Sequence, residues 1–105
     1  MNEKLIKNLE KELLHIAKHN KSIIEIDIVG SYARNMQKYY SDIDIIFVYS
    51  NVINKDFLFM SIGKMINEYK ILIHPILIKS ELLMQKNKYF NELLLNKKNI
   101  YTCSA

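Results

Sequence analysis

Two aspartates one residue apart, Asp42 and Asp44, stand at the start of a strongly apolar segment and could bind a metal ion. Residues i and i+2 of a β-strand point to the same face with side chains roughly 7 Å apart, so the two carboxylates would repel each other. A divalent cation between them would relieve that repulsion. Mg²⁺ suits the pair, because it binds through one or two protein carboxylates, water and substrate phosphates.

Gly30 and Ser31 could supply a phosphate site facing these aspartates, because they directly follow an apolar segment. A strand-to-helix turn at this point presents free backbone N–H groups and the positive end of a short helix. Glycine permits close approach of the backbone, and the serine hydroxyl can donate to a phosphate oxygen. Arg34, the only arginine beside fourteen lysines, follows within reach and could bind phosphate in a bidentate manner.

Plainer interpretations of these residues stay open. Gly30 and Ser31 could form an ordinary turn, Arg34 could be a surface cation, and the aspartates could be a solvated strand start capped by Ser41. Neither GxxxxGK[ST] nor GxGxxG occurs, so the turn is neither a P-loop nor a dinucleotide-binding fingerprint.

Apolar periodicity predicts the elements that position these residues. They are a helix over 3–19, a strand over 23–29, a turn or two of helix after Gly30, a strand over 42–49, a helix over 56–69, a strand over 71–78, short helices over about 80–85 and after Asn87, and a terminal strand at Ile100 and Tyr101. This order indicates an α/β (α+β) fold, a small mixed sheet with helices packed mainly on one face, in a single domain over residues 1–105.

Several further residues carry expectations. Glu25 and Asp27 should lie on a solvated face of a strand near the sheet edge. Pro75 should lie where its strand lacks a hydrogen-bonding neighbour on one side or contains a bulge. Gly63, inside a helix, should mark a close packing contact or a partner surface. His15 and His19 should be surface residues, since no further ligand accompanies this i, i+4 pair.

The Gly-Ser pair, ten further residues and the Asp-x-Asp pair reproduce a known signature without a gap. The chain thereby resembles the minimal nucleotidyltransferases of the DNA polymerase β superfamily, and Ala33, Arg34 and Ser41 also look like that family. The resemblance implies that the aspartates hold Mg²⁺ (or Mn²⁺) on a nucleoside triphosphate, with ATP as the first candidate. An acceptor hydroxyl would attack the α-phosphorus and pyrophosphate would leave. It also implies a helical HEPN-type partner protein, the two acting as antitoxin and toxin.

The chain departs from the family at the third carboxylate, which the family carries on the strand after the helix. His74 is the only ionisable residue in 71–78, so it is the candidate for this third position. The plainer interpretation is a partly buried histidine whose hydrogen bonds are satisfied within the fold. Asp27 is a second candidate for a substitute carboxylate. The alternative function is therefore a catalytically weak or inactive antitoxin of the same fold that works by protein contact alone.

The composition of the chain excludes several other classes of protein. The 105 residues are 50% hydrophobic and 25% charged, and no stretch reaches the about 18 apolar residues of a membrane span. The start does not resemble a signal peptide, and the single Cys103 excludes an intramolecular disulfide, so we expect a cytoplasmic protein. A net charge of +4 would permit weak attraction to nucleic acid, but an RNA-binding module lacks support because no aromatic and basic motif occurs.

Overall fold

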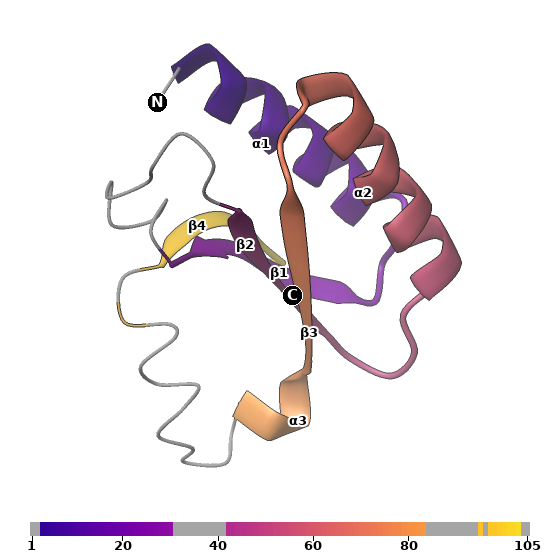
Figure 1. The fold of residues 1–105 in the computed structure, drawn as a ribbon. Coiled ribbons are helices and arrows are strands. Elements are labelled where there is room, and N and C mark those ends of the chain that lie inside the picture. Colours follow the sequence, from indigo (N-terminus) through magenta and orange to yellow (C-terminus); the bar gives the residue numbers. More distant parts are fainter. Residues whose placement is uncertain (1–2, 31–41, 84–94, 96, 104–105) are drawn as a thin grey trace.

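The computed structural model describes residues 3–30, 42–83, 95 and 97–103. In chain order these residues form α1 (Glu3–Lys18), β1 (Ile23–Val29), β2 (Ile43–Tyr49), α2 (Lys55–Tyr69), β3 (Ile73–Lys79), α3 (Ser80–Leu83) and β4 (Lys98–Thr102). The strands make one sheet in the order β3-β2-β1-β4 (Figure 1). β1 is antiparallel to β2 and to β4, whereas β2 and β3 are parallel and are joined by α2.

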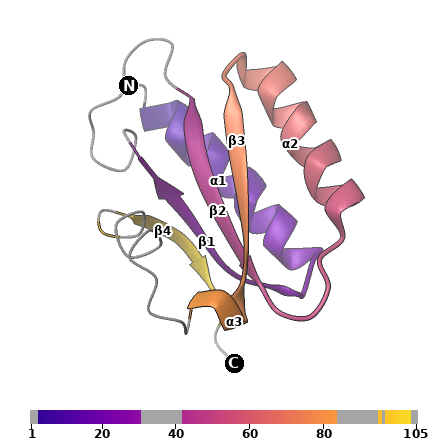
Figure 2. The ribbon, with the colours of Figure 1, turned by 60° about the horizontal axis from the view of Figure 1, so that its bottom comes forward.

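Helices α1 and α2 cover one face of this sheet (Figure 2). The buried face of α1 presents residues spaced by three and four positions, Leu9, Leu13, Ile16 and Ala17, as an amphipathic helix requires. Alternate residues of β2 meet them, because side chains of a strand point to its two faces in turn. The resulting core contains Ile43, Ile45 and Phe47 of β2 and Leu58, Ile62 and Met65 of α2.

The opposite face of the sheet carries a second, smaller apolar cluster of Val29, Ile46, Val48 and Ile78. The strand register arranges this face in rows, since paired residues on neighbouring strands point to the same side. One row is Val29, Asp44 and His74, and the next is Asp27, Ile46 and Ile76. Each of these two rows thus combines apolar and ionisable side chains, on the face that α1 and α2 leave free.

The predicted fold class is confirmed, and the predicted elements agree closely with those in the described residues. β1, which was expected near the sheet edge, is the inner strand next to the edge strand β4, which pairs along its outer side. Pro75 lies on β3, which is an edge strand as its missing N–H requires. The expected helical turns after Gly30 and the helix after Asn87 lie outside the described residues.

Local signals explain where α2 begins and ends. The side chain of Asn54 accepts a hydrogen bond from Phe57 N at 3.1 Å, which caps the first turn. Lys70 ends the helix in the left-handed conformation, and its N–H donates to Ile66 O at 2.9 Å. No helix among the described residues has the length and apolar character needed to cross a bilayer.

Gly63 lies inside α2 without the close packing contact that was one of the two expectations for it. A Cβ built at this position would have no atom within 4 Å, so the helix surface there is open. The glycine therefore has no packing role within the described part of the chain.

We expect Gly63→Ala to stabilise the protein. In an exposed helix interior, alanine is more stable than glycine by up to about 1 kcal/mol in the free energy of folding. No neighbour obstructs its methyl group at this position. Urea denaturation followed by circular dichroism measures the effect. A loss of stability on this substitution would show that the α2 surface at Gly63 is covered.

Candidate functional site

The end of β1 and the beginnings of β2 and β3 lie together at one edge of the sheet, the edge that is formed by strand ends and not by an outer strand. Gly30 directly follows β1, Asp42 directly precedes β2, and Ile43 pairs with Ile73 where β2 and β3 both begin. A backbone hydrogen bond of 2.9 Å from Ile43 N to Leu72 O holds the two strand starts together. This edge collects the sequence-predicted site residues that fall within the described part of the chain.

Asp44 and His74 are direct neighbours in the parallel register and point to the same face. His74 Nδ1 and Asp44 Oδ1 are 3.2 Å apart, within hydrogen-bond distance, and Nδ1 is the donor in the tautomer that carries its hydrogen. The Asp44 side chain is 35% exposed and the His74 side chain is 65% exposed. The plainer interpretation of His74 as a partly buried residue was therefore wrong, because it lies at the open start of an edge strand.

Gly30 fits against the other oxygen of the same carboxylate. Its φ is +75°, a left-handed conformation that residues with a Cβ rarely adopt. A Cβ built there would lie 2.8 Å from Asp44 Oδ2, closer than van der Waals contact allows. The left-handed backbone thus favours glycine at this turn, and a side chain there would displace the Asp44 carboxylate.

Asp42 precedes the first residue of β2 and is exposed, while Ile43 and Ile45 point into the helix-covered core. The alternation that buries these isoleucines gives Asp42 and Asp44 the opposite face. Ser31, Arg34 and Ser41, the other residues expected at the site, lie outside the described residues. The face thus has two solvent-accessible carboxylates beside a turn that contains no side chain at Gly30.

The donor set fits a hard divalent cation that is bound together with a ligand. Asp44 Oδ2 faces the space that a side chain at Gly30 would fill, and Asp42 is open to solvent. Within the described ranges no three His, Cys, Asp or Glu residues are grouped closely enough to hold a metal ion. Water and the oxygens of a bound phosphate would have to complete the coordination, as they do for Mg²⁺ in nucleotide sites.

Asp27 lies one row further into the sheet than Asp44, on the same face. It was expected on a solvated face, but its side chain is buried with 0% exposure, and β4 pairs along the outer side of β1 at this position. Asp27 Oδ1 accepts a hydrogen bond of 2.8 Å from Asn99 Nδ2. Among the described residues no donor faces Asp27 Oδ2, which is also buried.

The pKa of Asp27 is raised to about 7, first by burial and then by the neighbouring Glu25 carboxyl, which accepts the proton that Asp27 retains. The same shared hydrogen bond lowers the pKa of Glu25, and an ion pair of 2.9 Å with Lys97 acts in the same direction. Asp27 is thus a carboxyl group that the fold stabilises in its protonated form. Sequence reasoning missed this, because only the pairing of β4 on β1 shows it.

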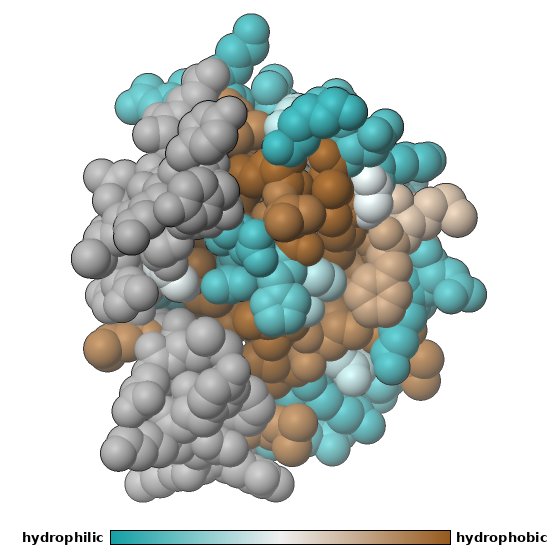
Figure 3. All heavy atoms as spheres, in the orientation of Figure 1, coloured by the Kyte–Doolittle hydropathy of each residue, from teal (hydrophilic) through white to brown (hydrophobic). Residues whose placement is uncertain are grey.

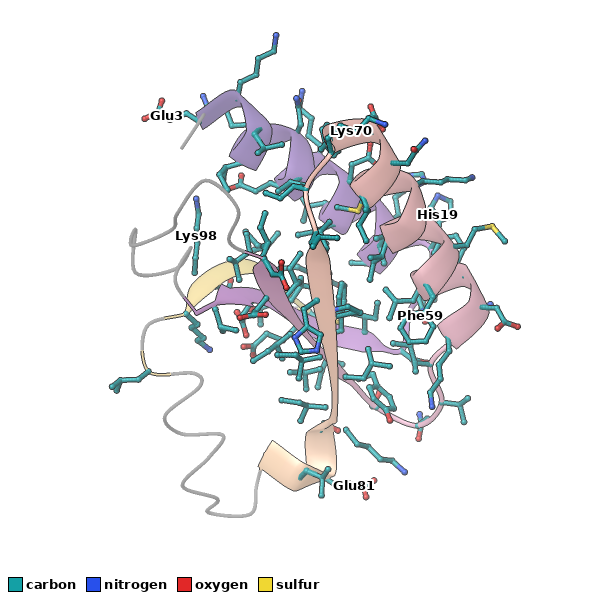
Figure 4. All side chains as sticks on the ribbon, in the orientation of Figure 1. Glu3, His19, Phe59, Lys70, Glu81 and Lys98 are labelled. Carbon is teal, nitrogen blue, oxygen red and sulfur yellow. The ribbon has the colours of Figure 1, made fainter. Side chains whose placement is uncertain are left out.

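His15 and His19 are exposed, as expected, with ring centroids 4.3 Å apart at the end of α1. Figure 4 shows His19 beside the two helices, on the other side of the molecule from Lys98 at the start of β4. In the space-filling view, hydrophilic atoms interrupt a largely apolar surface where β2 and β3 lie (Figure 3). The polar start of these strands is therefore distinct from the histidine pair.

A search against protein-family models matches residues 6–101 to the nucleotidyltransferase domain. No curated protein sequence matches the chain significantly. The family match covers most of the chain, including β1, β2 and β3 in full and all but the last residue of β4.

Solved structures of similar fold include a toxin–antitoxin complex with AMP-PNP, at 15% identity and a TM-score of 0.65 over 90% of this chain and 74% of that chain. A MntA–HpeT toxin–antitoxin mutant with two aspartates changed to glutamate matches at 13% identity and 0.64, over 90% and 74%. A tri-AMPylated HEPN toxin from Shewanella oneidensis in complex with MNT antitoxin matches at 12% and 0.58, over 90% and 70%. At these identities the likeness establishes a shared fold.

We expect Gly30→Ala to destabilise the protein by about 2 kcal/mol or more, because the left-handed backbone and the overlap with Asp44 Oδ2 act together. In an Asp44→Ala background the overlap disappears, and the loss should fall to about 1 kcal/mol from the backbone alone. Chemical denaturation of the four variants of this cycle measures both terms. Gly63→Ala is the matched control, and equal losses in the two backgrounds would contradict the contact.

Asp27 should make the free energy of unfolding fall as pH rises from about 4 to about 7. In this window the folded state retains a proton that the unfolded chain, with its ordinary pKa of 3.8, has lost. The side-chain amide introduced by Asp27→Asn can still accept from Asn99 and donate to Glu25, so this substitution should remove the fall. At pH 8 the variant should be more stable than the parent by on the order of 2 to 4 kcal/mol. Denaturant titrations at pH 5 and pH 8 test this, and parallel pH profiles would contradict it.

Proposed function

The chain belongs to the nucleotidyltransferase domain family, and we propose that it binds a nucleoside triphosphate with a divalent cation and transfers a nucleotidyl group to a hydroxyl. The proposed acceptor is a helical HEPN-type toxin, and the chain would act as its antitoxin in the cytoplasm. ATP is the proposed nucleotide. The family match and the toxin–antitoxin complexes of similar fold support this proposal.

The observation that carries the proposal is the contact between Gly30 and Asp44. A carboxylate lies close to a glycine in the left-handed conformation, at the point where β1 ends. A phosphate group bound by the turn would therefore lie beside the carboxylates of the acidic strand. A Gly-Ser turn followed by an Asp-x-Asp strand, the signature that the sequence carries, matches this arrangement.

Each residue has a proposed role. Gly30 lets the triphosphate approach the backbone, and Ser31 and Arg34 donate to its phosphate oxygens. Asp42 and Asp44 would hold Mg²⁺ on the triphosphate, which when bound neutralises phosphate charge and polarises the α-phosphorus. A bond forms between the acceptor oxygen and the α-phosphorus while the bond to the bridging oxygen breaks. Pyrophosphate then leaves, and the hydroxyl proton passes to solvent water.

The neighbours support the choice of nucleotide and partner. One chain of this fold was crystallised in a toxin–antitoxin complex with AMP-PNP, an analogue of ATP. Another is in complex with a toxin that carries three AMP groups. Transfer of AMP from ATP to a toxin side chain is the reaction that connects these two observations.

A second candidate function is an antitoxin that works by contact alone. The observation that favours it is His74, because β3, the strand after α2, presents an imidazole and not a carboxylate beside Asp44. A site that binds the nucleotide but activates the acceptor poorly would transfer slowly.

We expect the double variant Asp42→Asn, Asp44→Asn to lose cation-dependent ATP binding and to keep its fold, because it removes the two carboxylates and their mutual repulsion. Isothermal titration calorimetry with ATP and Mg²⁺ measures binding, and thermal unfolding checks the fold. Asp56→Asn, at an exposed aspartate of α2, is the matched control and should bind as the parent does. Undiminished affinity in the double variant would refute the proposed site.

Transfer separates the two candidate functions. The chain is incubated with α-labelled ATP, Mg²⁺ and the HEPN-type protein encoded beside it. Label on the partner, lost in the double variant, supports the transferase. Neutralisation of the toxin that persists in the double variant, with no label transferred, supports contact alone.

A further inference from the structure

We propose that His74 and Asp44 bind the nucleotide-bound cation as a pair of protein ligands, which phosphate oxygens and water complete, and that His74 makes this site favour a nitrogen-accepting ion such as Mn²⁺ over Mg²⁺. The inference rests on the proposed function, since it concerns the same cation. It goes further by naming a donor from β3 and the ion that this donor selects.

The first support is the distance between the two donor atoms. His74 Nδ1 and Asp44 Oδ1 are 3.2 Å apart. Two ligands on adjacent corners of an octahedron with bonds of about 2.1 Å are about 3.0 Å apart. The spacing thus lets one ion bind both atoms in place of the direct contact between them, with little movement of either strand.

The second support is how firmly the sheet holds this pair. Asp44 and His74 are register partners on adjacent parallel strands, and the pairing continues through Ile46 and Ile76. Both side chains are open to solvent at the strand starts, so an ion can reach them. The backbone thus presents the carboxylate and the imidazole together.

The third support is the chemistry of the donor atoms. Mg²⁺ strongly prefers oxygen, whereas imidazole nitrogen suits divalent transition ions. Mn²⁺ accepts carboxylate and phosphate oxygens in the same octahedral arrangement and also accepts nitrogen. An imidazole in place of a carboxylate therefore weakens Mg²⁺ more than Mn²⁺, and the ratio of the two affinities should depend on residue 74.

The first experiment measures that ratio on the full chain. α,β-Methylene-ATP, which cannot lose pyrophosphate, is held in excess while Mg²⁺ or Mn²⁺ is titrated by calorimetry. His74→Asp restores a carboxylate, so the ratio Kd(Mg²⁺)/Kd(Mn²⁺) should fall about tenfold or more from the parent value. His19→Ala removes an exposed imidazole far from this edge and should leave the ratio unchanged.

The second experiment detects the bond directly. Pulsed electron paramagnetic resonance of bound Mn²⁺ reports coupling to a directly bound ¹⁴N. The coupling should be present in the parent and in His19→Ala, and absent in His74→Ala and His74→Asp. Circular dichroism of each variant confirms that the chain is folded.

The outcomes distinguish this inference from the function on which it rests. Cation-dependent nucleotide binding with no ¹⁴N coupling, or with a ratio unchanged in His74→Asp, overturns the His74 ligand and leaves the proposed function intact. Absence of any cation-dependent nucleotide binding in the folded parent overturns both. Coupling that His74→Ala abolishes, together with the fall in the ratio, supports the ligand.

Discussion

The position of Asp44 is the constraint on which the rest of the site depends. Its carboxylate lies between a glycine that leaves it room and a histidine that hydrogen-bonds to it, on a strand whose alternate residues fill the main core. A shift of β2 by one residue would bury this charge and expose the isoleucines, so the apolar core fixes which face the carboxylate occupies. The same packing of Ile43 and Ile45 that stabilises the fold therefore positions the chemistry.

Asp27 shows what happens to a carboxyl group one row further inward. It lies on the same face, yet it is fully buried, and its pKa of about 7 reflects the cost of an ion there. Asp44, near the start of β2, stays accessible to solvent. The two carboxyl groups thus differ in how far they lie from the strand ends. The fold keeps Asp27 protonated, whereas Asp44 is available to a cation. Asp27 is accordingly a poor substitute for the missing third carboxylate.

Local patterns predicted most of the fold, and long-range pairing explains what they missed. The period of α1, the apolar segment after Asp42 and the punctuation by Gly30 and Pro75 are encoded within a few residues. The inner position of β1 and the burial of Asp27 depend on β4, more than 70 residues further along the chain, where Asn99 donates to Asp27. The exposure of His74 likewise depends on β3 being an edge strand that begins beside Asp44.

Residue 74 is the point at which the two candidate functions separate. Every other position of its strand on this face, Ile76 and Ile78, is apolar and packs on the second cluster. An antitoxin that needed only a docking surface could have a further apolar residue on this face at the start of β3. Residue 74 is instead a histidine, and its Nδ1 faces the Asp44 carboxylate at a distance that one ion could bridge. A polar side chain placed where the sheet opens to solvent adds little to packing, and it is available to a ligand that binds beside Asp44.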